Sequence, residues 1–285
     1  MIFGGEMKIT SLWEFLKILE ELPRKKGSSL YFRGHSDEKY VLEPSLFRRN
    51  NYKKNEHLMF KEILKERPEQ FAEDQTTLEK LVKMQHFGLP TRLLDITKNP
   101  LVALYFACVL HDGGTASKND GEVIVLSLDG RLMKYNDSDT VMILSNLCKL
   151  KPKEKKFNTN LSKNEFNETD NVGKLIWEIQ REKPIFYNII NPKDINSIIP
   201  IKATKTNERI QVQDGLFLLF GINNETDTPL VKTDWIVKTK SDERIIIDAK
   251  SKRKIQNQLE EINISRKTLF PGLESTANII KRNYS

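Results

Sequence analysis

Residues 100–110, "PLVALYFACVL", constrain this chain more than any other stretch, because they are apolar around the whole helical wheel. Asn99 is a good helix N-cap, and Pro100 suits the first helical position, where a missing N–H costs nothing. A helix without a polar face has to be buried, and this one is shorter than the about 20 apolar residues that span a bilayer. We therefore predict a buried helix at 100–110 inside a protein core.

A polar segment, "QHFGLPTRLLDITK", precedes this helix directly. We predict a loop from Thr91 to Thr97 that the buried helix holds rigid and that borders the main cleft. Binding and catalytic groups often lie on loops carried by a rigid scaffold. A purely structural role for the same polar side chains is the alternative.

The remaining pattern predicts helices before the middle of the chain and strands after it. Helices are expected at 11–21, 56–67, 76–87, 140–149, around Trp177, at 252–262 and at 273–282. Strands are expected at 28–34, 122–128, 184–190, 197–202, 209–221, 234–240 and 243–249. This order favours an α+β fold with a mostly antiparallel sheet and flanking helices. We expect one domain over residues 1–285, with a helical and loop insertion at about 129–183.

Cysteine content and the N-terminus bear on the cellular compartment. Cys108 and Cys148 are the only cysteines, so there is neither a disulfide framework nor a metal-binding cluster. The N-terminal residues alternate apolar and charged side chains and lack a signal-peptide core. These features favour a cytoplasmic protein without a membrane segment.

The net charge of +7 is concentrated in two basic runs, at 149–163 and 249–258. The favoured interpretation is a solvated loop and a solvated helix start, because lysine runs are common on protein surfaces. Attraction to phosphate, in nucleic acid or in a nucleotide, is the alternative.

Arg33 is the first candidate ligand-binding residue. Leu30 and Phe32 alternate with it, so we expect Arg33 to face away from the apolar side near the end of a strand. Gly34 then permits close approach of backbone or ligand. The guanidinium is a planar fork that binds phosphate through two hydrogen bonds. An ion pair with Asp95 is the alternative.

Common enzymatic signatures are missing. The sequence has no Walker loop, G-x-G-x-x-G, H-E-x-x-H or G-x-S-x-G motif in the required context. The four histidines do not form a metal-ligand set, so no metal site is predicted.

Four motifs resemble those of the FRG domain family, whose name repeats the tripeptide Phe32, Arg33 and Gly34. They are "YFRG", "QHFGLPTRLLDITKNPLVALYFA", "RIQVQDGLF" and "LFPGL". The resemblance runs from about residue 28 to the C-terminus. This family occurs mainly in bacteria and their mobile elements, and the resemblance by itself implies no particular reaction.

A second set of features is similar to mono-ADP-ribosyltransferases of the arginine-first type. Those enzymes carry an Arg on an early strand, a Ser/Thr-rich segment before a helix ending in A..FA, and a Glu-bearing strand. The resemblance implies NAD as substrate, with positioning and electrostatics doing most of the catalysis. It nominates Arg33, Asp95 and Gln213 as catalytic, and Arg33, Gly34, His86, Thr91, Arg92 and Thr97 as NAD-binding.

The chain departs from that pattern at the third motif. Gln211 and Gln213 stand where the transferases have Glu, with Asp214 adjacent. A glutamine can hydrogen-bond a ribose hydroxyl but supplies no negative charge. Either Asp214, Asp95 or another carboxylate supplies it, or the domain binds a nucleotide without turnover.

The expected function is thus an NAD-dependent ADP-ribosyltransferase-like enzyme of bacterial origin. It would be a toxin or anti-phage effector that modifies nucleic acid or protein, with an antitoxin or regulatory protein as a further partner. A non-catalytic nucleotide- or nucleic-acid-binding module and a structural interaction domain are the alternatives. A carboxylate that converges on Arg33 in one pocket favours the enzyme, whereas an Arg33 fully paired in the core favours the structural role.

Overall fold

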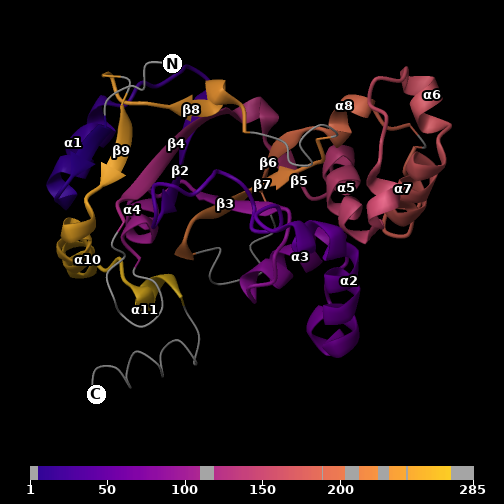
Figure 1. The fold of residues 1–285 in the computed structure, drawn as a ribbon, viewed down its shortest axis with the longest axis horizontal. Coiled ribbons are helices and arrows are strands. Elements are labelled where there is room, and N and C mark those ends of the chain that lie inside the picture. The colour runs from indigo at the N-terminus through magenta and orange to yellow at the C-terminus, as the bar shows by residue number, and fades with distance from the viewer. Residues whose placement is uncertain are drawn as a thin grey trace.

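A mixed sheet of nine strands organises the described part of the chain (Figure 1). The computed structural model describes residues 6–109, 119–187, 189–202, 212–223, 231–241 and 243–270. The strand order is β1-β9-β4-β2-β3-β7-β6-β5, with β8 also paired to β4. All pairings are antiparallel except β1 with β9 and β5 with β6. The strands are β1 (Glu6–Ile9), β2 (Ser28–His35), β3 (Leu93–Thr97), β4 (Gly121–Asp129), β5 (Lys134–Tyr135), β6 (Ile198–Lys202), β7 (Gly215–Phe220), β8 (Ile236–Val237) and β9 (Arg244–Ile247).

Helices lie at both ends of this sheet, with α1 and α10 at one end and α5, α6 and α7 at the other (Figure 1). The described α-helices are α1 (Leu12–Glu21), α2 (Asn50–Glu66), α3 (Thr77–His86), α4 (Pro100–Cys108), α5 (Asp139–Asn146), α6 (Lys163–Asn167), α7 (Asp170–Gln180), α8 (Pro192–Ile195), α10 (Lys252–Glu261) and α11 (Arg266–Leu269). The predicted α+β fold with a mostly antiparallel sheet and flanking helices is confirmed. The helix predicted at 273–282 lies outside the described residues. Among the described helices, none is long and apolar enough to cross a bilayer.

The predicted strand at 184–190 is wrong, because the described residues there form turns and irregular backbone. Its alternation is genuine, since Phe186 is buried while Ile185 and Tyr187 are exposed. However, a side chain, and not a neighbouring strand, bonds both backbone groups of Ile190. Asn167 Oδ1 accepts from Ile190 N at 2.7 Å, and Asn167 Nδ2 donates to Ile190 O at 2.8 Å. Of the strand predicted at 234–240, only the two residues of β8 form a strand.

The predicted loop from Thr91 to Thr97 is largely the strand β3, which lies between β2 and β7 inside the sheet. Leu94 and Ile96 are buried on one face, while Asp95 is exposed. Because side chains alternate across a strand, a single polar residue between apolar ones is compatible with a central strand. The segment is therefore rigid because of its own sheet pairing as well as because of the helix behind it.

Helix α4 packs on the sheet through direct backbone contact. A Cβ at Gly34 of β2 would lie 1.9 Å from the Ala103 carbonyl oxygen, and one at Gly121 of β4 would lie 2.3 Å from that of Ala107. Ala103 and Ala107 are completely buried. The predicted buried helix is thus confirmed, and the close approach that Gly34 permits is that of the α4 backbone.

The shortest strand pairing in the sheet is that of β2 with β3, where Phe32 and Thr97 form the single registered pair. Strands β2 and β4, in contrast, pair along all of β2, from Ser28 to His35. Apolar clusters cover both faces, and the cluster opposite α4 contains Tyr31 of β2, which is 4% exposed. Arg33 lies on the face opposite Leu30 and Phe32, where it contacts His35, as expected, but that face is also apolar because Tyr31 belongs to the core there.

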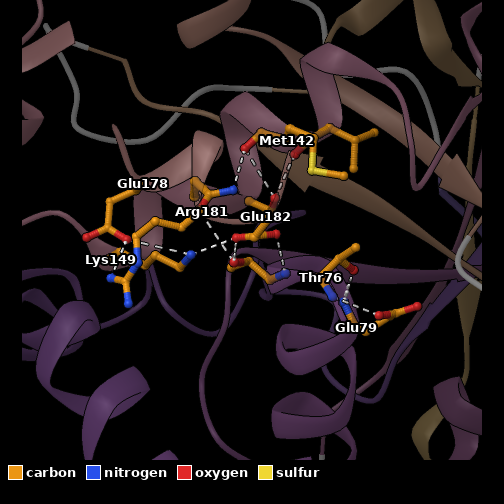
Figure 2. Close-up of polar contacts among 11 residues, drawn as sticks. Thr76, Glu79, Met142, Lys149, Glu178, Arg181 and Glu182 are labelled. Carbon is orange, nitrogen blue, oxygen red and sulfur yellow. Dashed lines mark hydrogen bonds and ion pairs between the residues drawn. The ribbon is translucent and has the colours of Figure 1, made fainter. Parts of the chain in front are cut away.

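A polar network attaches the segment 129–183 to the N-terminus of α3 (Figure 2). The Glu182 carboxylate accepts a hydrogen bond from Thr77 N at 2.7 Å and one from Lys149 Nζ at 2.6 Å, and it also accepts from Thr77 Oγ1. Burial raises the pKa of Glu182, but Lys149 and Thr77 lower it by more. A negative charge at a helix N-terminus is favourable, because the first backbone N–H groups carry partial positive charge. Glu182 thus holds the helical segment against α3.

Replacing Gly34 with Ala should lower the free energy of unfolding by about 1–3 kcal/mol or more, because the new methyl group overlaps the α4 backbone. The measurement is urea unfolding of the purified variant. Gly173→Ala is the matched control, since a Cβ there meets nothing within 4 Å, and that helical position should gain up to about 1 kcal/mol. Equal stability of the two variants would contradict the packing described above.

Candidate functional site

A small pocket opens at the narrow junction of β2 and β3. Its volume is about 140 Å³, and β2, β3, α4 and the beginning of β7 contribute its walls. The lining residues are Phe32, Arg33, Gly34, Asp95, Ile96, Thr97, Val102, Ala103, Phe106, Gln213, Gly215 and Phe217. Five residues nominated from sequence, namely Arg33, Gly34, Asp95, Thr97 and Gln213, therefore line one pocket.

Arg33 bridges the two strands where their ladder stops. Its Nη1 donates a hydrogen bond of 2.6 Å to the backbone oxygen of Asp95, and its Nε donates one of 3.1 Å to His35 Nε2. The Asp95 carboxylate lies 3.9 Å from the same Nη1. Burial lowers the pKa of Arg33 to about 10, with Asp95 opposing the shift. The guanidinium therefore remains charged at neutral pH.

His35 is a buried structural partner of this arginine. Its side chain accepts from Arg33 through Nε2, so the ring proton of the neutral form lies on Nδ1. Burial, together with the positive charges of Arg33 and Arg48, lowers the pKa of His35 to about 3. An uncharged ring accepts the Arg33 hydrogen bond without neutralising the guanidinium. Within the described residues, no group of His, Cys, Asp or Glu side chains could hold a metal ion.

Asp95 is the carboxylate of the pocket, and its side chain is 61% exposed. Gln85 Nε2 donates to its Oδ2 at 2.8 Å, and Gln85 Oε1 in turn accepts from Thr91 Oγ1. Thr91 is buried and contributes no wall to the pocket, so it acts through Gln85. Sequence reasoning missed Gln85, although it begins the motif "QHFGLPTRLLDITK" in which the other members lie.

Thr97 and Gln213 line the pocket with polar groups that are already engaged. Thr97 Oγ1 donates to the Gln213 backbone oxygen at 2.6 Å and accepts from Asn99 N at 2.9 Å. The Gln213 side-chain Nε2 donates to Leu269 O at 2.8 Å. Gln211 lies outside the described residues. These contacts fix the start of β7 beside the pocket and leave Asp95 as the carboxylate that lines it.

One family model matches part of the chain. Residues 28–114 match the FRG domain. The match includes β2, β3 and α4, and with them Arg33, Gly34 and Asp95, whereas Gln213 and the segment 129–183 lie outside it. The chain has no significant match among curated proteins or solved structures. None of these comparisons links it to ADP-ribosyltransferases.

Besides Thr91, two residues of the FRG segment that were expected to bind the cofactor lie outside the pocket, namely Arg92 and His86. Arg92 is 1% exposed, and its Nε and Nη2 donate to the two carboxylate oxygens of Glu56 at 2.8 and 2.6 Å. Its Nη1 donates to Phe220 O at 2.8 Å. His86 ends α3, where its ring lies 5.0 Å from that of Phe87. Neither lines the pocket, because Arg92 points into the core and His86 lies at a helix end.

Glu56 is shared by two cations. Lys155 Nζ also donates to its Oε2, so one carboxylate pairs with Arg92 and Lys155. Burial raises the pKa of Glu56, but the two positive charges outweigh this and hold it at about 2. The interpretation of run 149–163 as a solvated loop is thus wrong for Lys155 and for Lys149, which lies within reach of Glu182. In run 249–258, Lys252 is buried and donates to Ser36 O at 2.6 Å.

Arg92→Met should destabilise the protein by about 3–5 kcal/mol, because the buried Glu56 carboxylate loses both hydrogen bonds that Arg92 donates and keeps only its contact with Lys155. Arg131→Met is the control, since Arg131 pairs with Asp129 on the surface and such pairs contribute about 0–1 kcal/mol. Chemical unfolding of both variants provides the comparison. A small, equal loss in both would contradict the structural role of Arg92.

Asp95→Ala should change the free energy of unfolding by at most about 1 kcal/mol, because its carboxylate is exposed and its contact with Arg33 is long. Thermal and urea unfolding measure this directly. A loss as large as that expected for Arg92→Met would show that Asp95 is a core partner instead of a pocket residue.

Proposed function

We propose that the protein is an NAD-dependent ADP-ribosyltransferase-like enzyme whose pocket at the β2–β3 junction binds the nicotinamide end of NAD. The observation that carries the proposal is the convergence of Arg33, Asp95 and Gln213 on this pocket, although they are far apart in the sequence. The resemblance to arginine-first ADP-ribosyltransferases nominates the same residues. The partly buried guanidinium fits the phosphates of such a substrate, and the exposed carboxylate fits the positive charge that develops on it during reaction.

The size and walls of the pocket suit one ring of the substrate. Its volume of about 140 Å³ is close to the about 150 Å³ of an apolar cavity that accepts benzene. Phe32, Phe106 and Phe217 provide aromatic surface for a nicotinamide. A neighbouring cavity of about 360 Å³ shares Phe32 and is lined by Arg24, Lys25 and Lys98, among others. Such basic residues suit the diphosphate of the dinucleotide.

The proposed reaction breaks the bond between nicotinamide and ribose. The bonding electrons leave with the nicotinamide, and positive charge develops on the ribose carbon. The Asp95 carboxylate stabilises this cation until an acceptor nucleophile bonds to the carbon and loses its proton. Arg33 donates to Asp95 O and His35 through Nη1 and Nε, and no described residue accepts from its Nη2, which is left for a phosphate or ribose oxygen. Positioning and electrostatics then carry the catalysis.

In this proposal the protein acts as a toxin or anti-phage effector on a nucleic-acid or protein acceptor, with an antitoxin or regulatory protein as partner. The alternative is a module that binds a nucleotide without turnover. One observation favours it, because the Gln213 amide is engaged with Leu269 O and supplies no charge. The two functions differ in whether nicotinamide is released.

Asp95→Asn should bind NAD like the wild type but release nicotinamide about 10²–10³-fold more slowly, a loss comparable to that of one transition-state hydrogen-bond donor. Arg33→Lys should bind NAD more weakly, because an ammonium cannot reproduce the guanidinium fork. Calorimetry measures binding, and chromatography of NAD incubated with protein, RNA and DNA acceptors measures release.

Arg181→Lys is the matched control, since Arg181 is exposed and lies on the helical segment away from the pocket lining. Unfolding curves of each variant establish that the fold is retained. Binding without release in the wild type would support the non-catalytic module. Absence of both would overturn the enzyme and leave the pocket without NAD.

A further inference from the structure

A second, larger cavity lies apart from the β2–β3 pocket and shares no lining residue with it. Its volume is about 750 Å³, within the roughly 300–1,000 Å³ of sites that bind small molecules. The walls come from the start of α2 with the residues before it, from the segment 152–160, and from Arg92 and Ile222. Of the charged residues that line it, five are cationic and one is a carboxylate: Lys53, Lys54, Arg92, Lys155, Lys156 and Glu56.

The deepest of these charges are not balanced. Arg92, Glu56 and Lys155 have side chains that are 1%, 5% and 12% exposed, and together they carry one net positive charge. Burying an uncompensated charge is costly. The Lys155 ammonium has three donors, and its hydrogen bond to Glu56 uses one. Burial lowers the pKa of Lys155 although Glu56 opposes the shift.

The rim adds more positive charge. Lys53 and Lys54 lie near the beginning of α2, and Lys156 follows Lys155 directly. The first turn of α2 contains no acidic residue, and its backbone N–H groups add partial positive charge. The pKa of His57 on the same helix is lowered by burial and by the charges of Lys155 and other lysines. An anion in the cavity would relieve the mutual repulsion of these groups.

The remaining walls are suited to an organic ring. Phe47 and Phe157 supply aromatic surface, and amide side chains come from Asn50, Asn158 and Asn160. Ligand sites typically combine apolar walls with a few well-placed polar groups, and lysine binds phosphate as a point charge. We propose that this cavity binds the phosphate groups of a nucleotide through Lys54, Lys155 and Lys156, with its base against the aromatic wall. This site is additional to the NAD pocket and independent of it.

The arrangement favours a small nucleotide over a nucleic-acid strand. The lysines of the 152–160 segment and of α2 border one hollow together with apolar residues. The other basic run contributes no residue to it, and its Lys252 is buried against Ser36. A strand would instead follow a charged groove that tracks its backbone.

Calorimetry of the full chain with ATP, AMP and adenosine at low ionic strength tests the site. ATP should bind, AMP should bind more weakly and adenosine should not bind, because the phosphates supply most of the attraction. The double variant Lys54→Gln with Lys156→Gln should weaken ATP binding by about tenfold or more. The control, Lys65→Gln with Lys153→Gln, removes equal charge from α2 and the same loop outside the lining and should change the affinity less than about twofold.

Three results would overturn the inference. The first is no ATP binding to the wild type, and the second is equal weakening by the two double variants, which would indicate general surface charge. The third is tighter binding of a single-stranded oligonucleotide than of ATP with the same dependence on Lys54 and Lys156. Arg33→Lys should leave ATP binding unchanged. Its loss in that variant would place the nucleotide in the NAD pocket and would also overturn the second site, whereas failure of NAD binding alone would leave this site intact.

Discussion

The backbone contact between α4 and the sheet determines where the other parts of the site can lie. Gly34 and Gly121 have no side chains on the surface that meets Ala103 and Ala107, so the helix lies directly on β2 and β4. Only Lys98 and Asn99 separate β3 from α4, so fixing the helix also fixes the end of that strand. One apolar wall of the pocket, formed by Val102, Ala103 and Phe106, is thus a face of the first turns of α4. Its position follows from two glycines.

The tripeptide at the end of β2 combines three physical roles. Phe32 packs in the core beneath α4, Gly34 admits the helix backbone, and Arg33 links β2 to β3 where the ladder ends. The guanidinium replaces a missing backbone hydrogen bond across the junction. Because the same arginine lines the pocket, the architecture and the proposed binding site depend on one side chain. Its removal therefore tests both, and a conservative substitution is needed to separate them.

Local patterns predicted the elements whose signal lies within a few turns. The buried helix, the amphipathic helices and the apolar strand β4 were all recognisable from periodicity. Strand β3 was not recognised, because two of its five residues, Asp95 and Thr97, are polar and made the segment resemble a loop. The strand predicted at 184–190 was wrong for the opposite reason. Its side chains alternate as in a strand, but Ile190 hydrogen-bonds to Asn167 and not to a neighbouring strand. Tertiary partners such as Gln85 for Asp95 have no short-range signature, and only the family resemblance brought Arg33 and Gln213 together before the structure did.

Arg33 and Arg92 belong to the same FRG segment, yet their partners give them different capacities. Glu56 meets Arg92 with both carboxylate oxygens in the core, so that fork is occupied by a carboxylate. Arg33 meets a backbone oxygen and the neutral ring of His35, neither of which carries a charge. Asp95 is exposed and 3.9 Å away, so solvent screens its attraction. The charge of Arg33 therefore remains available to an anion. An arginine inside the protein is available to bind an anion when no carboxylate of the protein is hydrogen-bonded to it, as is the case for Arg33 but not for Arg92.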